Sequence, residues 1–234
     1  MPKMPLEEQV RLLSMVDVLE PLSEEELEEL ARRAPDTHVE QGETIYTPEE
    51  NSERLFVLKR GRVRVYKIDP EGHELTLSVV EDGTILGEMA LTGQHLPGVY
   101  LQALKPSVVA TLKRRDLEHL ILKAPEVGLR LVRLLSERLH ETETRLAELT
   151  HKDVTARLAS QVLRLRESEG VITGEGCKIP TRYTHEQLAT MIGSKRVPVT
   201  RAFRKLEEAG AVELKDRHMH VTDFEALKRV AEAE

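Results

Sequence analysis

Residues 184–206, THEQLATMIGSKRVPVTRAFRKL, have the pattern of two short helices joined by a tight turn. Thr184 is placed to N-cap the first helix, and Gln187, three residues later, completes a capping box. Gly193 ends this helix, and we expect the second helix to begin near Ser194 or Lys195. The stretch therefore predicts a helix-turn-helix.

The second predicted helix has an apolar side and a basic side. Val199, Phe203 and Leu206 recur at steps of four and three, so they should face inward, and Pro198 falls in the first turn, where a proline is tolerated. The opposite side carries Arg196, Val197, Thr200, Arg201 and Arg204. A helix that presents arginines outward after a glycine turn suits the major groove of DNA.

The distribution of charge agrees with this interpretation but does not establish it. The whole chain of 234 residues has a net charge of −7, whereas residues 182–217 contain eight Lys and Arg against five Asp and Glu. We expect phosphate contacts in this basic region, while the acidic remainder keeps the protein soluble. A local difference this small is also what an ordinary solvated surface gives.

Composition excludes several other classes of protein. No run of eighteen apolar residues is present, and the first residues lack the pattern of a signal peptide, so we expect a cytoplasmic protein without a membrane partner. Cys177 is the only cysteine, which excludes an intrachain disulfide and a cysteine-rich metal site. No nucleophile–base pairing, metal-ligand spacing or phosphate loop indicates an enzyme.

The N-terminal half changes from a helical pattern to a strand pattern. Residues 6–34 carry two helical segments, the first with Val10, Leu13, Val16 and Leu19 and the second capped by Ser23. From residue 37 to 113 short alternating segments predict strands over 44–46, 55–58, 63–66, 75–80 and 108–112, with Gly42, Gly61, Gly72 and Gly83 between them. Many short strands favour a β sandwich or jelly roll.

A long helix follows this region, after a short helix over residues 117–121. Its apolar positions recur at steps of 3, 4, 3, 4 and 3, which is typical of a coiled-coil seam. The seam consists of Val132, Leu135, Leu139, Thr142, Leu146 and Leu149. Charged residues on both sides keep it narrow, so a parallel dimer helix is favoured over a helix buried in a core.

The C-terminal part begins where Asp153 can N-cap a helix over residues 154–167. Residues 168–183 are interpreted as a connector to the helix-turn-helix. A hairpin is predicted beyond it, with residues 212–214 paired to 219–221 across 215–218, as a basic wing. The predicted α+β fold is divided into a sensor or effector domain at 1–116, a dimerisation segment at 117–152 and a DNA-binding domain at 153–234.

Three motifs, in this order, resemble the cyclic-AMP receptor protein family of bacterial transcription regulators, the CRP/FNR superfamily. They are Gly-Glu-Met-Ala-Leu at 87–91, Asp-Val-Thr-Ala-Arg-Leu-Ala at 153–159 and Gly-Ser-Lys-Arg-Val-Pro-Val-Thr-Arg at 193–201. The resemblance covers roughly residues 15–225. It implies a homodimer that binds a palindromic operator and recruits or blocks RNA polymerase.

The resemblance also implies an effector pocket, but one that departs from the family pattern. Gly87, Glu88 and Met89 look like the start of the family's phosphate-binding cassette, with Glu88 on the ribose hydroxyl and Thr142 touching the adenine across the dimer. Where the family has an Arg followed by Ser, Thr or Ala on the cyclic phosphate, this chain has Pro97-Gly98. We expect cyclic AMP to bind weakly or not at all, since its main charge partner is missing. A cyclic-AMP-dependent regulator, and a nucleotide-binding module acting through protein contacts, are the alternatives.

The family comparison also assigns expected roles in reading DNA. Arg196 and Arg201 match the two family arginines that meet guanines, whereas Val197 and Pro198 replace the family's Glu and Thr. The acceptor for a cytosine amino group is therefore absent, and we expect a half-site that is relaxed or altered at that base pair. The expected phosphate contacts are Lys195, Thr200, Arg204, Lys205 and Arg217.

Overall fold

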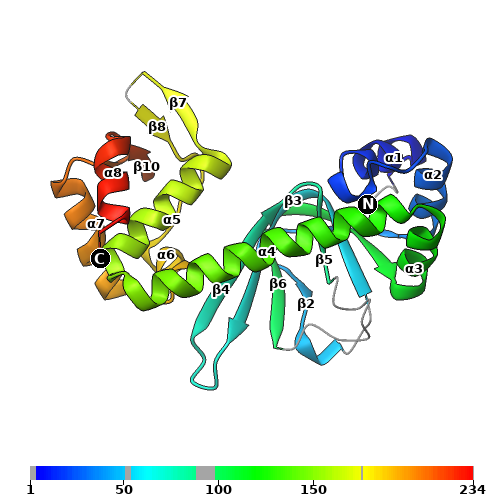
Figure 1. Ribbon diagram of the computed structural model, residues 1–234, viewed down its shortest axis with the longest axis horizontal. Helices are drawn as coiled ribbons and strands as arrows, with labels where there is room; N and C mark the ends of the chain where they lie inside the picture. Colours follow the sequence, from blue (N-terminus) through cyan, green and yellow to red (C-terminus); the bar gives the residue numbers. More distant parts are fainter. Residues whose placement is uncertain (1–3, 51–53, 88–97, 175, 234) are drawn as a thin grey trace. The chain divides into compact units, whose positions relative to one another are not determined.

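The computed structural model describes residues 4–50, 54–87, 98–174 and 176–233 (Figure 1). The chain divides into two compact units, residues 1–139 and 140–234, and the boundary lies within helix α4 (Pro125–His151). The predicted division into three segments, with its own dimerisation segment at 117–152, stays a prediction.

The first unit combines a rolled antiparallel sheet with helices at its ends. Its helical elements are α1 (Leu6–Ser14), η1 (Asp17–Leu19), α2 (Glu24–Arg33), η2 (Pro48–Glu50), α3 (Arg114–Lys123) and the first part of α4. Its strands are β1 (Asp36–Val39), β2 (Thr44–Tyr46), β3 (Arg54–Ile68), β4 (Glu74–Glu81), β5 (Thr84–Leu86) and β6 (Val99–Lys113). The first helical segment was predicted to include Val16 and Leu19, but α1 ends at Ser14 and Leu19 lies in η1.

The sheet is built on its two longest strands, β3 and β6, which pair with each other along most of their length. The strand order is β1-β6-β3-β4, with β2 also paired to β6 and β5 also paired to β3. Because each long strand changes partners along its length, the sheet rolls on itself (Figure 1). The predicted α+β class with a β roll is confirmed.

Two predicted strands, 55–58 and 63–66, are in fact one strand, and Gly61 lies inside it rather than between strands. Gly61 has φ = 125°, and the β3–β6 register shifts on both sides of it. A glycine bulge continues the strand through a bend that other residues resist, so the sequence pattern of a turn was misleading here. The short strands β1 and β5 were not predicted.

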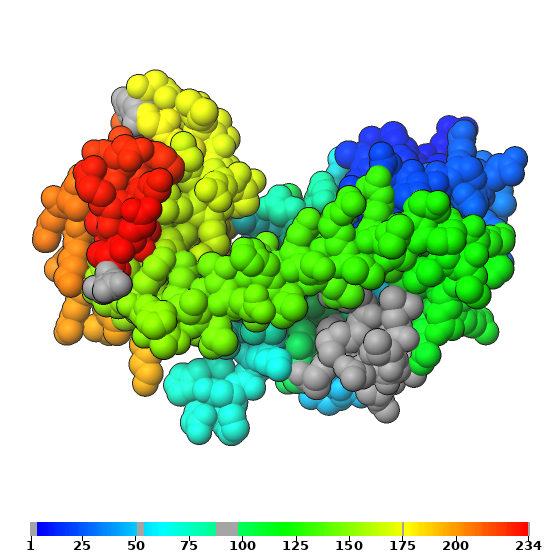
Figure 2. All heavy atoms as spheres, in the orientation of Figure 1, coloured from blue at the N-terminus to red at the C-terminus, as the bar shows by residue number. Residues whose placement is uncertain are grey.

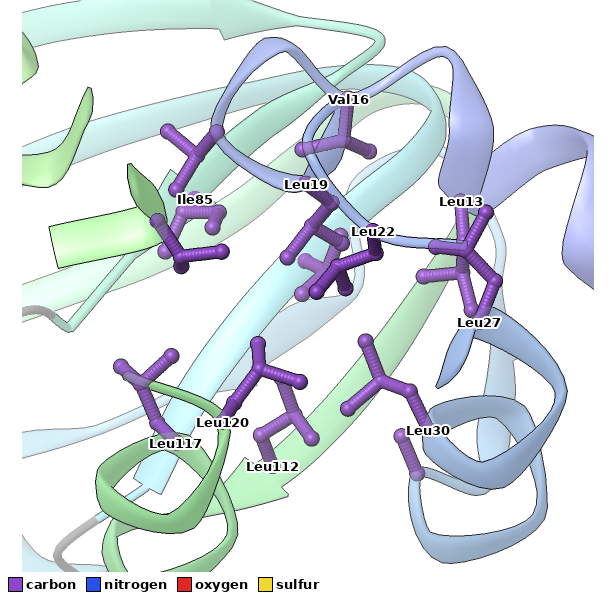
Figure 3. Close-up of a cluster of buried hydrophobic side chains, with 14 of the residues drawn as sticks. Leu13, Val16, Leu19, Leu22, Leu27, Leu30, Ile85, Leu112, Leu117 and Leu120 are labelled. Carbon is purple, nitrogen blue, oxygen red and sulfur yellow. The ribbon is translucent and has the colours of Figure 1, made fainter. Parts of the chain in front are cut away.

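The alternation of side chains along β3 divides the apolar residues of the first unit between two cores. Leu55 and Val57 face a cluster made with the helices α1, α2 and α3, whereas Phe56 and Leu58 face the interior of the roll. Figure 3 shows the first cluster, in which side chains from α1 to α3 converge on Ile85 of β5 and Leu112 of β6. The predicted short helix before Ala124 is confirmed as α3.

The second unit contains a helical core and a small sheet. Its elements are the last part of α4, then α5 (Val154–Glu169), β7 (Val171–Thr173), β8 (Gly176–Lys178), α6 (His185–Met191), α7 (Arg196–Glu208), β9 (Val212–Lys215), β10 (His218–Val221) and α8 (Phe224–Ala231). Asp153 caps α5 by accepting from the backbone NH of Ala156 at 2.8 Å, as predicted, although α5 continues to Glu169. The core joins α5, α6, α7 and α8, with Leu158, Leu188 and Leu206 almost inaccessible to solvent.

The sheet of the second unit corrects two predictions. Residues 168–183 are more than a connector, because β7 and β8 form a hairpin that joins the wing in the order β7-β8-β10-β9. The wing pairs 212–214 with 219–221 as predicted, but Lys215 and His218 also pair, so its turn has two residues rather than four. Asp216 and Arg217 both have positive φ, 53° and 65°, as a type I′ turn requires. In Figure 1 the β7–β8 hairpin extends away from the helices of its unit.

Among the described residues, no helix is both long and apolar enough to cross a membrane.

Candidate nucleic-acid interface

Helix α6 begins at the capping box that the sequence predicted. The Thr184 hydroxyl accepts from the backbone NH of Gln187 at 3.1 Å, and the Gln187 side chain accepts from the backbone NH of Thr184 at 2.8 Å. Two of the free NH groups at the start of the helix are thus satisfied. Leu188 and Ala189 are buried and fix α6 against the core of the unit.

The turn between α6 and α7 depends on Gly193. This residue has φ = 61°, which is the left-handed conformation that favours glycine, and the NH of Ser194 bonds back to the carbonyl of Ala189 at 2.9 Å. Helix α7 then begins at Arg196, with Lys195 in the N-cap position, within a residue or two of the predicted start. Pro198 lies in the first turn, so its missing NH breaks no hydrogen bond within the helix.

Helix α7 has the two faces that its periodicity predicted. Val199, Phe203 and Leu206 are buried, and Ala202 joins them. This inner face anchors the helix and determines which residues point outward. Pro198 and Thr200 are half-buried. The exposed residues are Lys195, Arg196, Val197, Arg201, Arg204 and Lys205. In Figure 2 the orange spheres of the segment around residue 200 lie at the surface of the second unit.

Thr200 is held in a hydrogen-bond chain. Its hydroxyl donates to the carbonyl of Arg196 at 3.0 Å, and Nδ1 of His185 lies 2.9 Å from the same oxygen. The His185 ring also packs on Phe203, with 5.3 Å between ring centroids. The hydroxyl proton of Thr200 is therefore engaged within the protein, and direct donation from Thr200 to a phosphate, as predicted, would require this chain to open.

An open cleft of about 490 Å³ lies between the start of α6, α7 and the wing. The polar residues around it are Tyr183, Thr184, His185, Glu186, Arg196 and Arg217. The cleft brings together Arg196 and Arg217, two basic residues that the sequence assigned to DNA. The sequence did not predict roles for His185 and Tyr183, because only the packing of α6 against α7 and the wing shows that they share this cleft.

The six predicted seam residues all lie on α4, and the large apolar ones among them are exposed. The exposed fractions of Val132, Leu139 and Leu146 exceed one half, at 61%, 60% and 64%. Leu135 and Leu149 are exposed by 42% and 48%. Large apolar side chains exposed at heptad spacing favour a partner helix.

The structure describes only the two ends of the predicted effector segment. Gly87 is buried with φ = 84°, and a Cβ there would lie 2.5 Å from the carbonyl oxygen of Arg54, so only glycine fits. Gly98 is exposed with φ = 67°. Glu88, Met89 and Pro97 lie outside the described residues, and their roles stay predictions.

Comparison with known proteins identifies both units. A cyclic nucleotide-binding domain model matches residues 36–124, and a Crp-like helix-turn-helix domain model matches residues 156–230. The chain belongs to the CRP/FNR family of transcription regulators. The helix-turn-helix, α6 and α7, is accordingly the DNA-binding part of this CRP/FNR-family regulator.

Individual relatives match over most of the chain. The "Global nitrogen regulator" of Synechococcus elongatus is 28% identical over 192 residues, which are 81% of this chain and 86% of that protein. The "CRP-like cAMP-activated global transcriptional regulator" of Mycobacterium tuberculosis is 26% identical over 190 residues, covering 81% and 85%. A CRP-family transcriptional regulator of Thermus thermophilus has a similar structure, with a TM-score of 0.71, 27% identity and coverage of 84% and 97%.

Proposed function

We propose that this CRP/FNR-family regulator is a cytoplasmic homodimer that binds a palindromic promoter site sequence-specifically and acts with RNA polymerase. The observation that carries the proposal is the geometry of α7. Its inner face is buried through Val199 and Phe203, so its position in the unit is determined, and its outer face presents Arg196 and Arg201 to solvent. A rigid helix with outward arginines is what insertion into a major groove requires.

Base reading is assigned to the exposed residues at the start and middle of α7. Arg196 and Arg201 each present a guanidinium that can donate two hydrogen bonds to O6 and N7 of guanine, at about 1–3 kcal/mol of discrimination per pair. Val197 is 60% exposed and can offer only apolar contact, for instance to a thymine methyl. The half-site should therefore contain guanines at the two arginine positions and accept a different base pair opposite Val197.

Backbone contacts are assigned to the basic residues around this face. Lys195, Arg204, Lys205 and Arg217 surround it, and Arg217 stands at the tip of the wing turn. Such residues set affinity and its dependence on salt more than they set sequence preference. Replacing any one of them should weaken binding to all sequences by a similar factor.

The seam on α4 supports the dimer. Two copies that pair their seams in parallel would bury these side chains and relate the two α7 helices by a two-fold axis. The two half-sites would then be read on successive major grooves, about 34 Å apart. A palindromic site follows from this symmetry.

Action without cyclic AMP is the second part of the proposal. It rests on the sequence Pro97-Gly98, which supplies no guanidinium where a cyclic phosphate would need one. The cyclic-nucleotide-binding-domain match and the cyclic-AMP-activated relative favour a nucleotide-dependent regulator instead. Calorimetric titration of the protein with cyclic AMP distinguishes the two, since the proposal predicts no heat of binding.

The experiment that tests DNA reading is the Arg201→Ala variant, with Arg229→Ala as a matched control. Arg229 is also an exposed arginine, but it lies on α8 rather than α7. Binding to a palindrome and to a scrambled duplex is measured by fluorescence anisotropy at one salt concentration. Arg201→Ala should lower the ratio of specific to non-specific affinity by about tenfold or more, since each bidentate guanine contact contributes about 1–3 kcal/mol in each half-site.

The control should keep the wild-type ratio. An unchanged ratio in Arg201→Ala, or an equal fall in both variants, would contradict the assignment of α7 as the reading helix.

A further inference from the structure

His185 is the only histidine among the described residues that line the cleft. Histidine is the side chain whose charge ordinarily changes between about pH 5 and pH 8. Its ring is half-buried and is fixed by Phe203 on one side and by Thr200 on another. The ring therefore has a defined orientation, and the hydrogen bonds around it determine which nitrogen carries a proton.

The two hydrogen bonds of the Thr200 hydroxyl show which ring nitrogen of His185 carries the proton. The Thr200 hydroxyl has one hydrogen, which it donates to the carbonyl of Arg196, so its oxygen can only accept from His185. Nδ1 of His185 must then carry hydrogen. In the neutral ring Nε2 is left without a proton and is an acceptor, which repels a phosphate oxygen. Protonation turns Nε2 into a charged donor, which is the form that a phosphate binds.

The charges around the cleft favour an anion. Arg196 of α7 and Arg217 of the wing lie on its walls with His185, whereas the phenol of Tyr183 donates to the Glu169 carboxylate. Glu186, the neighbour of His185 on α6, is the one acidic residue among those that line the cleft. The cleft continues from the reading face of α7, since Arg196 belongs to both. A duplex seated on α7 would therefore carry its sugar–phosphate backbone towards the cleft.

We propose that this cleft holds a phosphate of the DNA backbone, bound by protonated His185 together with Arg217. DNA binding is then coupled to the uptake of one proton by His185 in each half-site. The proposal rests on the proposed function, because it requires that α7 binds DNA. Thr200 acts as the positioning residue, which keeps the hydrogen on Nδ1 and so makes donation from Nε2 depend on pH.

The coupling has a definite sign. Because the bound state holds more protons than the free state, affinity must rise as the pH falls, by up to about tenfold per pH unit for each proton taken up. Phosphodiesters do not titrate in this range, so the effect belongs to the protein. We expect the wild-type protein to bind a palindrome about fivefold or more tightly at pH 6 than at pH 8, at constant ionic strength.

The test compares His185→Gln, His185→Arg and His218→Gln with the wild type, by anisotropy titration at the two pH values. His185→Gln cannot become charged and should bind with the weaker wild-type affinity at both. His185→Arg carries a permanent charge and should bind tightly at both, so it rescues binding at pH 8. His218 is a half-buried histidine of β10, in the wing. The His218→Gln variant should keep the wild-type dependence of DNA affinity on pH.

Three results would overturn the proposal: equal wild-type affinity at both pH values, an unchanged pH dependence in His185→Gln, or its loss in His218→Gln. Thermal melts of each variant exclude unfolding as the cause. If the wild type shows no preference for any palindrome at either pH, the proposed function itself fails. If it prefers a palindrome equally at both pH values, only the role of His185 fails.

Discussion

Gly61 of β3 lies so close to Ser107 of β6 that a Cβ atom does not fit between them. A Cβ added at Gly61 would lie 2.0 Å from the Ser107 Oγ, and the backbone there has φ = 125°. The same Ser107 oxygen accepts from the backbone NH of Arg62 at 3.3 Å and donates to the carbonyl of Lys105 at 2.7 Å. Ser107 would lose these two hydrogen bonds if it moved away from position 61.

Gly61→Ala should destabilise the first unit by about 3 kcal/mol, from backbone strain and from the displacement of Ser107. Gly72→Ala is the matched control, since Gly72 also has positive φ, 85°, but has open space around it. It should cost only about 1 kcal/mol. Denaturation followed by circular dichroism measures both. Equal losses would contradict a role for the close approach of Ser107.

At the residue scale, the sequence predicts what depends on neighbours along the chain. The capping box of α6 and the outward arginines of α7 follow from spacings of three and four residues, and both are present. The need for a glycine at position 61 cannot be predicted from such spacings, because Ser107, which excludes a side chain there, is 46 positions away. His185 was missed for the same reason, since its partner Thr200 is on another helix.

The junction of α4 and α5 is held by a group of charges in the second unit. The Glu148 carboxylate is only 11% exposed and accepts from Arg164 at 3.0 Å and from Lys152 at 3.2 Å. Lys152 also donates to Ser160 at 2.9 Å, which ties the end of α4 to α5. Burial by itself would raise the pKa of Glu148, but Arg164 and Lys152 outweigh it, so that the pKa lies below its ordinary value.

Glu148→Gln should therefore destabilise the second unit by about 1–2 kcal/mol at neutral pH. Because the folded pKa is depressed, the ion pairs stabilise above the unfolded pKa of about 4.3, and this contribution is lost as the pH falls through the folded pKa. The difference between variant and wild type should thus shrink from about pH 7 to about pH 4. Urea denaturation at several pH values measures it.

Glu118→Gln provides the control, because Glu118 pairs with Arg114 at 2.7 Å on the exposed surface of α3. It should cost less than about 0.5 kcal/mol at any pH. A loss in Glu148→Gln that is as small as this, or that grows towards acid pH, would contradict the proposed role of the Glu148 pairs.

At the element scale, helices whose pattern repeats over several turns were predicted, whereas strands of three residues were mostly not. The long helix and α7 each repeat their pattern over several turns, and both are present. The three-residue strands β5, β7 and β8 have too few positions to show an alternation. In β7 the apolar Val171 and Ile172 are exposed, at 54% and 84%, so burial gives no signal either.

For the whole molecule, the proposed dimer depends on the exposed seam of α4. Leu146→Lys would place a charge in the middle of that seam and should shift the protein from dimer to monomer in sedimentation velocity. Ile172→Lys introduces the same charge at an exposed residue of β7, away from the seam, and should leave the dimer intact. A monomeric wild type, or an intact dimer in Leu146→Lys, would contradict the seam.

The order of the parts along the chain was predicted most completely. A β roll, a long helix and a helix-turn-helix with a wing follow one another as expected. Each part has a different periodicity, of two or of three to four residues, which can be recognised from the sequence alone. The effector pocket could not be predicted to the same degree, because its function depends on how residues 87–98 are arranged.

The most direct measurement of the central claim is an equilibrium titration of the wild-type protein on a panel of palindromes and scrambled duplexes, with and without cyclic AMP. We predict that the protein binds one palindrome about 10³-fold or more tightly than scrambled DNA, as specific regulators do. We also predict the same affinity with and without cyclic AMP. Equal affinity for palindromic and scrambled duplexes would contradict sequence-specific binding. A gain of about tenfold or more with cyclic AMP would contradict action without the nucleotide.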